Sequence, residues 1–268
     1  MTVKFRNPPI NELVIGVYFT RELEALRAEH VGLFWSTIRA EFPTIQQQPI
    51  VVPPFGAHPV GVIEAIPPGE MFPLPRFWME SADGEMLVQI QRNAFLFNWR
   101  KRETRYPHFE VVKKSFDRNF ALYMTFLEKE FNVPVPEIQI AELNYINLIE
   151  GKEYWQAPLD TNRVLPRLRL PVEDSTVLGP VDFNIMTIQR FSSDLVVTTS
   201  IRSGRNALAA MRPALVIEFR GIGSLGATTK VEADAWFERA HETIGECFVT
   251  ATNPDIQERY WERINNAE

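Results

Sequence analysis

The sequence predicts an α+β fold of two similar halves, and residues 86–131 carry most of that prediction. Side chains from Met86 to Gln91 follow a period of two, which is typical of a strand. Arg92 and Asn93 suit a tight turn, and residues 94–99 are expected to form the returning strand. From Phe109 to Phe131, apolar residues recur at steps of three and four, on one helix face. Together these patterns predict an antiparallel sheet with a long helix packed across it.

The rest of the first half follows from local signals. A strand is expected at about 12–19, and a helix from an N-cap at Thr20 to the residue before Pro43. Prolines are dense from Pro43 to Pro75, which is typical of loops and short edge strands. A further strand is expected at about 77–80.

The second half is predicted to repeat this order, with at most a short first helix. Its expected strands cover residues 138–149, 183–191, 195–202 and 215–219. Thr229 and Glu232 form a capping box at the start of a closing helix, and Ile256 suggests one more short helix. The predicted halves are 1–133 and 134–268. They share an order of elements rather than residue identities.

Each half is therefore expected to be an antiparallel sheet with long helices on one face. The expected architecture is a TATA-binding-protein-like or helix-grip-like tandem.

Composition narrows the class of protein. The chain has 268 residues, 45% hydrophobic and 23% charged, as in ordinary globular proteins. A net charge of −6 argues against attraction of the whole molecule to nucleic acid or anionic membranes. The single cysteine, Cys247, leaves a reducing compartment as the default. The apolar run at 13–19 is far shorter than the about 20 residues of a membrane span. With no signal peptide recognised, we expect a cytoplasmic protein and no membrane partner.

A glycine-rich segment after a predicted strand matches G-x-G-x-x-G, from Gly221 to Gly226. A dinucleotide site requires a helix that opens directly at the glycines. The predicted helix begins only near Thr229, so we expect a flexible connection between strand and helix here.

No other catalytic or metal-binding pattern is recognised. The four histidines lack ligand spacing, and Cys247 lies on an apolar helix face, as a small buried hydrophobe would. The common hydrolase, phosphate-loop and zinc-protease motifs are missing from the sequence. We therefore assign no catalytic residue, no metal ligand and no cofactor, although missing motifs do not exclude an enzyme.

Two groups of residues are candidates for binding. Polar residues on the predicted strands alternate with core positions and form either a binding face of the sheet or a plain solvent-exposed one. The segment from Asn98 to Arg105 is the strongest basic cluster and is either a partner-binding loop or a solvated connection. The candidate binding residues are Gln89, Gln91, Asn98, Trp99, Arg100, Arg102, Arg105 and Arg202.

Several segments of the first half carry a family resemblance. They are Asn7-Pro-Pro-Ile-Asn-Glu12 before a strand, and Leu87-Val-Gln-Ile-Gln91 followed by Phe95-Leu-Phe-Asn-Trp99-Arg100 and Tyr106-Pro107. The chain resembles a sporadically distributed bacterial and archaeal family of comparable length, with a Pro-Pro-Ile-x-Glu start and a Gln-rich strand before Asn-Trp-Arg. The resemblance implies a prokaryotic protein and transfers no catalytic residue. Patchy distribution favours mobile or defence-linked genes, such as toxin–antitoxin or anti-phage loci.

The leading functional prediction is a non-enzymatic binding or accessory protein. It engages a protein partner, or itself as a homo-oligomer, in a bacterial defence or toxin–antitoxin context. One alternative is a small hydrophobic ligand bound in a helix-grip cavity lined by phenylalanines and tryptophans. The other is nucleic acid bound on a saddle-shaped sheet, against which the net charge argues.

Overall fold

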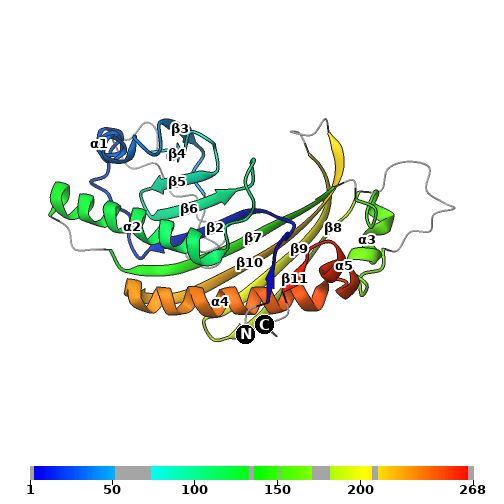
Figure 1. Ribbon diagram of the computed structural model, residues 1–268. Helices are drawn as coiled ribbons and strands as arrows, with labels where there is room; N and C mark the ends of the chain where they lie inside the picture. The colour runs from blue at the N-terminus through cyan, green and yellow to red at the C-terminus, as the bar shows by residue number, and fades with distance from the viewer. Residues whose placement is uncertain are drawn as a thin grey trace.

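The computed structural model describes residues 3–51, 74–132, 136–150, 152–170, 182–206 and 211–264. The protein is a mixed α+β molecule built on one large antiparallel sheet with a few helices (Figure 1). The sheet has nine strands in the order β3-β4-β5-β6-β2-β7-β10-β9-β8. A separate two-stranded sheet joins β1 and β11 near the chain ends. The α+β class predicted from the sequence is therefore confirmed.

In the large sheet, the strands of the predicted first half, β2 to β6, lie toward one edge and those of the predicted second half, β7 to β10, toward the other, whereas β1 and β11 form the separate sheet. Their bounds are β1 Lys4–Phe5, β2 Ile10–Phe19, β3 Thr44–Gln48, β4 Arg76–Glu80, β5 Met86–Gln91, β6 Ala94–Arg100, β7 Ile138–Glu150, β8 Asn184–Ser192, β9 Leu195–Asn206, β10 Arg212–Thr228 and β11 Arg263–Ile264. The first long strands of the two halves, β2 and β7, pair with each other, Gly16 opposite Glu142. The sheet thus passes from one predicted half into the other without a break.

The long helices lie on one face of this sheet, which we call the helix face (Figure 1). The helices are α1 Ala28–Ile38, α2 Phe109–Phe131, the 3-10 helix η1 Pro158–Asp160, α3 Thr161–Val164, α4 Lys230–Ala251 and α5 Pro254–Arg259. Helix α2 packs on β6 and β2, and α4 packs on β10 and β7. Within the described residues, no helix has the length and apolar character to cross a membrane.

The main core fills the space between helices and sheet. Alternate residues of β2, namely Leu13, Ile15 and Val17, are fully buried there. On α2, Phe116 and Phe120 stack on each other and contact Phe95 of β6. Residues between these positions on the strands point to the opposite side of the sheet, which we call the second face.

The predicted start of the first helix is wrong. Helix α1 begins at Ala28, eight residues after the proposed cap at Thr20. The intervening chain is tied to the sheet, because Thr20 donates its N–H to the Glu137 carbonyl and Leu23 to the Arg92 carbonyl. These long-range bonds compete with a helical turn, and no local signal announces them.

The glycine-rich segment is also different from the prediction. Gly221 and Gly223 lie inside β10, which continues to Thr228 instead of ending near 219. A Cβ atom on Gly223 would lie only 2.4 Å from the Trp236 ring, so this glycine allows α4 to approach the sheet. The capping box at Thr229 and Glu232 is confirmed at the start of α4.

Two other predicted helices are confirmed. Helix α2 has the predicted bounds, and α5 forms near Ile256. The cysteine expected to be buried, Cys247, is half-buried on α4 and packs against the core. Most of the proline-rich segment after β3, residues 52–73, lies outside the described residues, as do 171–181.

Candidate functional site

The second face carries a first polar cluster over β2, β4, β5 and β6. The Gln89 amide donates to Asn98 Oδ1 (2.6 Å), and Asn98 Nδ2 donates to Glu12 Oε1 (2.6 Å). Arg76 Nη1 and Trp78 Nε1 both donate to Gln89 Oε1, at 2.7 and 2.8 Å. Five side chains from four strands thus form one connected network.

The edges of this cluster are charged and close to Trp78. Arg100 Nη2 pairs with Glu80 Oε1 at 2.6 Å and also donates to the Gly84 carbonyl at 3.0 Å. The guanidinium groups of Arg76 and Arg100 lie 5.3 and 5.8 Å from the Trp78 ring centre, within range of a cation–π contact.

Burial affects the two charged ends of the cluster differently. It raises the pKa of the Glu12 carboxyl, although the hydrogen bond from Asn98 acts in the opposite direction. Burial also lowers the pKa of the Arg76 guanidinium. Both shifts indicate that the network lies partly withdrawn from water.

A second polar cluster lies on β2, β7 and β10. Tyr18 donates its hydroxyl to Glu142 Oε2 (2.9 Å), and Arg220 Nε donates to Glu142 Oε1 (2.8 Å). Glu142 is only 4% exposed, so this carboxylate is compensated inside the protein rather than by solvent. Burial acts to lower the pKa of Arg220, but the charge of Glu142 and the hydrogen bond to it, together with smaller effects of Tyr18 and Glu218, outweigh burial, and the pKa is raised.

Farther along the same strands, Glu218 connects two more side chains. It accepts from Asn144 Nδ2 at 2.8 Å and from Arg202 Nη1 at 3.2 Å. A small apolar core on the second face adjoins these polar side chains and includes Tyr18 of the second cluster. It consists of Val14, Tyr18, Ala94, Leu96, Ile140 and Ile222, with Val51 packed against it.

The structure places the sequence-predicted residues in three settings. Gln89, Asn98 and Arg100 belong to the first cluster, and Arg202 binds Glu218 on the second-half strands. Gln91 is also on the second face, where its amide donates to the Val51 carbonyl and accepts from the Val51 N–H. These polar side chains bind one another or the backbone, and their first effect is to fix the shape of the face.

The predicted basic loop does not form one surface. Trp99 is fully buried on the helix face, where its ring contacts Tyr106 at 5.3 Å. Arg102 and Arg105 are exposed in the connection between β6 and α2. Asn98 and Trp99 therefore point to opposite faces, as neighbours on a strand must.

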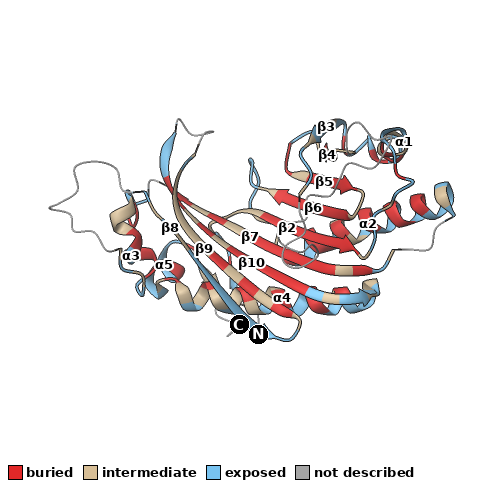
Figure 2. Ribbon diagram, turned by 180° about the vertical axis from the view of Figure 1, so that it is seen from behind, coloured by how far each residue is buried: buried red, intermediate tan, exposed pale blue. Residues whose placement is uncertain are grey.

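The most exposed apolar side chains of the sheet lie on β8, an edge strand of nine residues. Met186, Ile188 and Phe191 are 64%, 53% and 48% exposed. Figure 2 shows β8 in the colour of exposed residues along most of its length. An edge strand presents backbone N–H and C=O groups that no neighbouring strand pairs. Among the described residues, β8 therefore combines free hydrogen-bonding groups with exposed apolar side chains.

A groove on the second face adjoins this edge. It has a volume of about 350 Å³, and its apolar lining comes from β7, β8, β9 and β10. Arg190, near the end of β8, and Asp194, in the β8–β9 turn, supply charge, and Asp194 pairs with Arg239 of α4 at 2.5 Å. A hydrogen bond from Ser192 is the main cause that lowers the pKa of Asp194. The apolar lining residues are Ile140, Ile188, Val196 and Ile222.

The opposite edge of the sheet is different. Strand β3 has five residues, TIQQQ, with only one apolar side chain. Such a short polar strand is a protected edge, whereas β8 is not. The two ends of the same sheet therefore have different capacities for recruiting another chain.

The residues of the β8 edge and its groove were missed by sequence reasoning. Met186 and Ile188 have the pattern of any strand, and only the strand order shows that β8 is an edge. The sole available signal was the lack of charge between Asn184 and Gln189, since edge strands usually carry charges.

No family model, no curated protein and no solved structure matches the chain. The described residues also contain no group of three or more histidine, cysteine or acidic side chains that could hold a metal ion.

Proposed function

We propose that the protein is a non-enzymatic binding protein that takes up an extended segment of a protein partner along β8. The observation that carries this proposal is the nine-residue edge strand with three exposed apolar side chains, Met186, Ile188 and Phe191. Added strands obtain affinity from main-chain hydrogen bonds and specificity from pockets for alternate side chains. Strand β8 and the groove beside it offer both.

The groove defines the chemistry of the partner segment. Its apolar lining suits aliphatic or aromatic side chains, whereas Arg190 is exposed and suits an acidic one. We therefore infer an extended, predominantly apolar segment that carries an acidic residue near Arg190. A second copy of β8 would bring another arginine instead.

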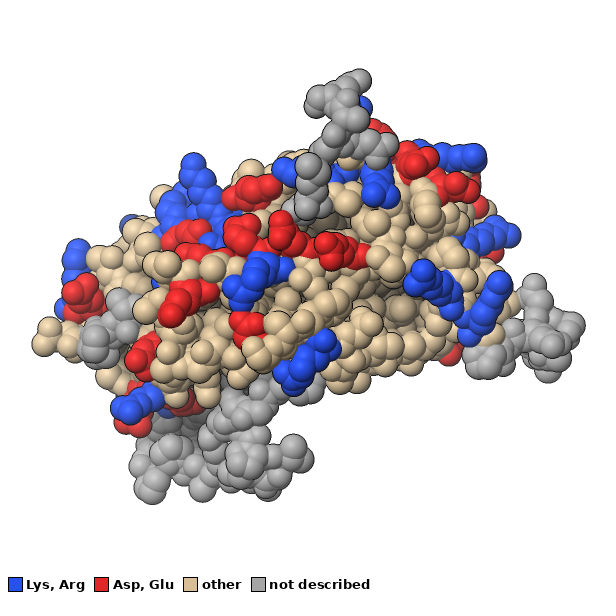
Figure 3. Space-filling model, turned by 90° about the horizontal axis from the view of Figure 1, so that it is seen from below, with Lys and Arg blue, Asp and Glu red and all other residues tan. Residues whose placement is uncertain are grey.

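A protein partner is favoured over nucleic acid by the charges of the second face. Carboxylates of Glu12, Glu142 and Glu218 alternate with its arginines and would repel phosphates. In the view of Figure 3, several acidic side chains follow one another in a row across the middle of the molecule, with basic side chains around them. This distribution of charges favours a protein partner, which carries side chains of both signs.

The test compares charge insertion at the two edges of the sheet. A tagged full-length chain is purified from its own host with Met186→Lys and Ile188→Lys, and bound polypeptides are measured by native mass spectrometry. We expect wild type to retain a stoichiometric second polypeptide and the β8 variant to lose it. The matched control is Thr44→Lys with Gln46→Lys on β3, which should retain it.

A further substitution tests the inferred acidic residue of the partner. Arg190→Glu should weaken retention of the same polypeptide, because it repels the inferred acidic residue. Equal retention by the wild-type, β8 and β3 proteins would contradict the proposal. So would a homodimer that the β8 substitutions dissociate, since the occupant of the edge would then be a second copy.

The tandem arrangement is part of the same proposal. Its support is the order of the long elements, since the first long strand of each half, β2 or β7, is central in the sheet and the last long helix is α2 or α4. The second half has only η1 and α3 where the first half has α1. A place in bacterial defence or toxin–antitoxin systems is proposed on the family resemblance alone.

A further inference from the structure

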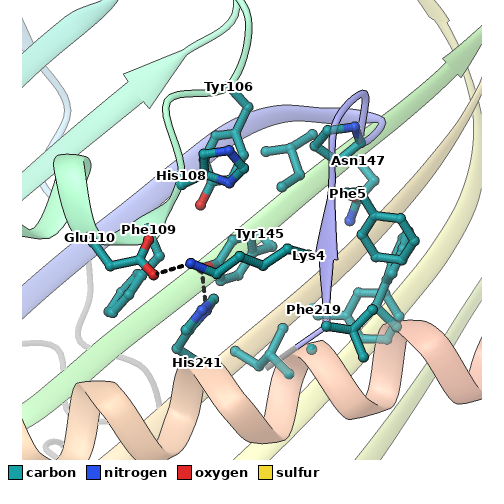
Figure 4. Close-up of a pocket in the computed structure, with 16 residues that line it drawn as sticks. Lys4, Phe5, Tyr106, His108, Phe109, Glu110, Tyr145, Asn147, Phe219 and His241 are labelled. Carbon is teal, nitrogen blue, oxygen red and sulfur yellow. Dashed lines mark hydrogen bonds and ion pairs between the residues drawn. The ribbon is translucent and has the colours of Figure 1, made fainter. Parts of the chain in front are cut away.

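A pocket on the helix face lies far from the β8 edge in sequence and on the opposite side of the sheet. It is enclosed by β1, the start of α2, helix α4 and strands β7 and β10 (Figure 4). Its volume is about 80 Å³. Most of its wall is apolar, including Phe5, Ile10, Phe109, Phe219 and Phe248.

The inner end of the pocket is polar. A hydrogen bond of 2.7 Å joins the Tyr145 hydroxyl to Nδ1 of His241, whose ring stacks on Phe109 at 4.2 Å. The Tyr106 hydroxyl is buried and points toward Tyr145 (Figure 4), whose hydroxyl acts on it as a hydrogen-bond donor and opposes the rise of its pKa. The contact falls short of ordinary hydrogen-bond geometry, and the Tyr106 O–H itself has no acceptor in the described part of the chain. A buried O–H group without an acceptor is unusual and costly.

These polar groups are uncharged at neutral pH. Burial raises the pKa of the hydroxyl groups of Tyr106 and Tyr145. Burial also lowers the pKa of His241 to about 4, so its imidazole is neutral at pH 7. The inner end therefore offers dipoles and no net charge.

The mouth of the pocket carries a compensated charge pair. Lys4 Nζ binds Glu110 Oε1 at 2.9 Å, and the two side chains are 46% and 57% exposed. A charged ligand group would have to separate this pair to gain a partner. The mouth of the pocket thus favours neither a cationic nor an anionic ligand.

We propose that this pocket binds a small neutral molecule with an apolar body and one carbonyl or hydroxyl oxygen that accepts a hydrogen bond from Tyr106. The body would lie among the aromatic and aliphatic wall residues. An enclosed cavity of about 150 Å³ holds benzene, so a ligand of that size would extend from this pocket into the mouth beside Lys4. This site is independent of the partner-binding edge and goes beyond the proposed function.

The structure offers a matched control for the hydroxyl that carries the proposal. Tyr123 is also buried, and its hydroxyl likewise has no acceptor within the described residues. It does not line this pocket. Tyr123→Phe and Tyr106→Phe therefore delete equivalent hydroxyls, of which only one faces the proposed ligand.

The experiment titrates the full chain at pH 7 with phenol as a neutral probe and benzoate as its charged counterpart, by ligand-observed NMR. We expect phenol to bind the wild type and Tyr123→Phe alike, and to bind Tyr106→Phe about tenfold more weakly. Benzoate should bind more weakly than phenol. Far-ultraviolet circular dichroism checks that each variant is folded.

Three outcomes would overturn the proposal. They are no phenol binding to wild type, equal phenol affinity for wild type and Tyr106→Phe, and tighter binding of benzoate than of phenol. None of them affects the partner-binding proposal, because the variants leave β8 and its groove unchanged.

Discussion

The identity of Gly223 is explained by the side chain packed against it. A Cβ atom there would overlap the Trp236 ring at 2.4 Å, whereas one on Gly204 would meet only ordinary contacts, the nearest at 3.6 Å. Both glycines lie in strands of the same sheet. They therefore form a matched pair for testing packing between α4 and the sheet.

We predict opposite effects for the two substitutions. Gly223→Ala should destabilise the protein by about 1–3 kcal/mol, because the Trp236 ring must move out of a filled core. Gly204→Ala should be neutral or slightly stabilising, since it reduces the freedom of the unfolded chain. Urea denaturation of both variants measures their free energies of unfolding. Equal values would contradict the proposed packing of Trp236 against Gly223.

His241 predicts a pH dependence of stability. Its folded-state pKa is lowered from 6.5 to about 4, so the unfolded chain binds more protons between these values. Stability should therefore be complete above pH 6.5 and fall as the pH drops toward 4, by about 1–2 kcal/mol at pH 4.5 for this partly buried group. The raised pKa of Glu12 acts in the opposite direction.

Urea denaturation at pH 7 and at pH 4.5 isolates this effect when wild type is compared with His241→Gln. Glutamine retains hydrogen-bonding capacity and does not titrate. We expect a smaller acid-induced loss of stability in the variant. An unchanged loss would assign the pH dependence to other groups.

At the scale of elements, local signals predict some boundaries and miss others. Helix α2 was predicted with its observed bounds, because its apolar residues recur regularly from Phe109 to Phe131. The start of α1 was not, because residues 20–27 are held by bonds to distant carbonyls of Glu137 and Arg92. Strands β1 and β11 were missed for the same reason, since two-residue strands from opposite chain ends leave no periodic pattern.

The capping box of α4 gives a prediction at this scale. Thr229 accepts from the Glu232 N–H, and the Glu232 carboxylate accepts from the Thr229 N–H. Thr229→Ala should destabilise the protein by about 1 kcal/mol. Thr243→Ala, in the middle of the same helix, should cost less, and a thermal melt of both variants compares them. A larger effect at Thr243 would contradict this view of how α4 begins.

The site was less predictable than the fold. The sequence places Gln89, Gln91 and Arg202 on one polar face, and in the structure all three lie on the second face. Asn98, expected in the basic loop, lies on the second face as well. Periodicity cannot tell that Gln89 binds both Asn98 and Trp78, or that Trp99 is fully buried in the core. Which side chains meet across neighbouring strands depends on the order of the strands, and so does the position of β8 at an edge.

At the scale of the whole molecule, the continuous sheet couples the two predicted halves. Strands β2 and β7 pair along most of their length, and the ends of the chain meet where Phe5 packs on Phe248 and Trp261. Neither half can unfold without exposing this central pairing and part of the shared core. We therefore predict a single cooperative unfolding transition.

Circular dichroism and tryptophan fluorescence test this cooperativity. Tryptophans lie in both halves, including Trp99 and Trp236 in the core. The two probes should report coincident transitions in urea. Two separate transitions would show that the halves are independent units joined by a dispensable strand pair.

We propose that the whole sheet is asymmetric in function, because its β8 edge binds a partner and its β3 edge does not. Hydrogen exchange resolved to individual strands, on the protein alone and on its complex with the captured partner, tests this most directly. The account predicts that amides of β8 become protected by about tenfold or more in the complex and that those of β3 do not change. Protection confined to other strands or to the helices, with β8 unchanged, would contradict it.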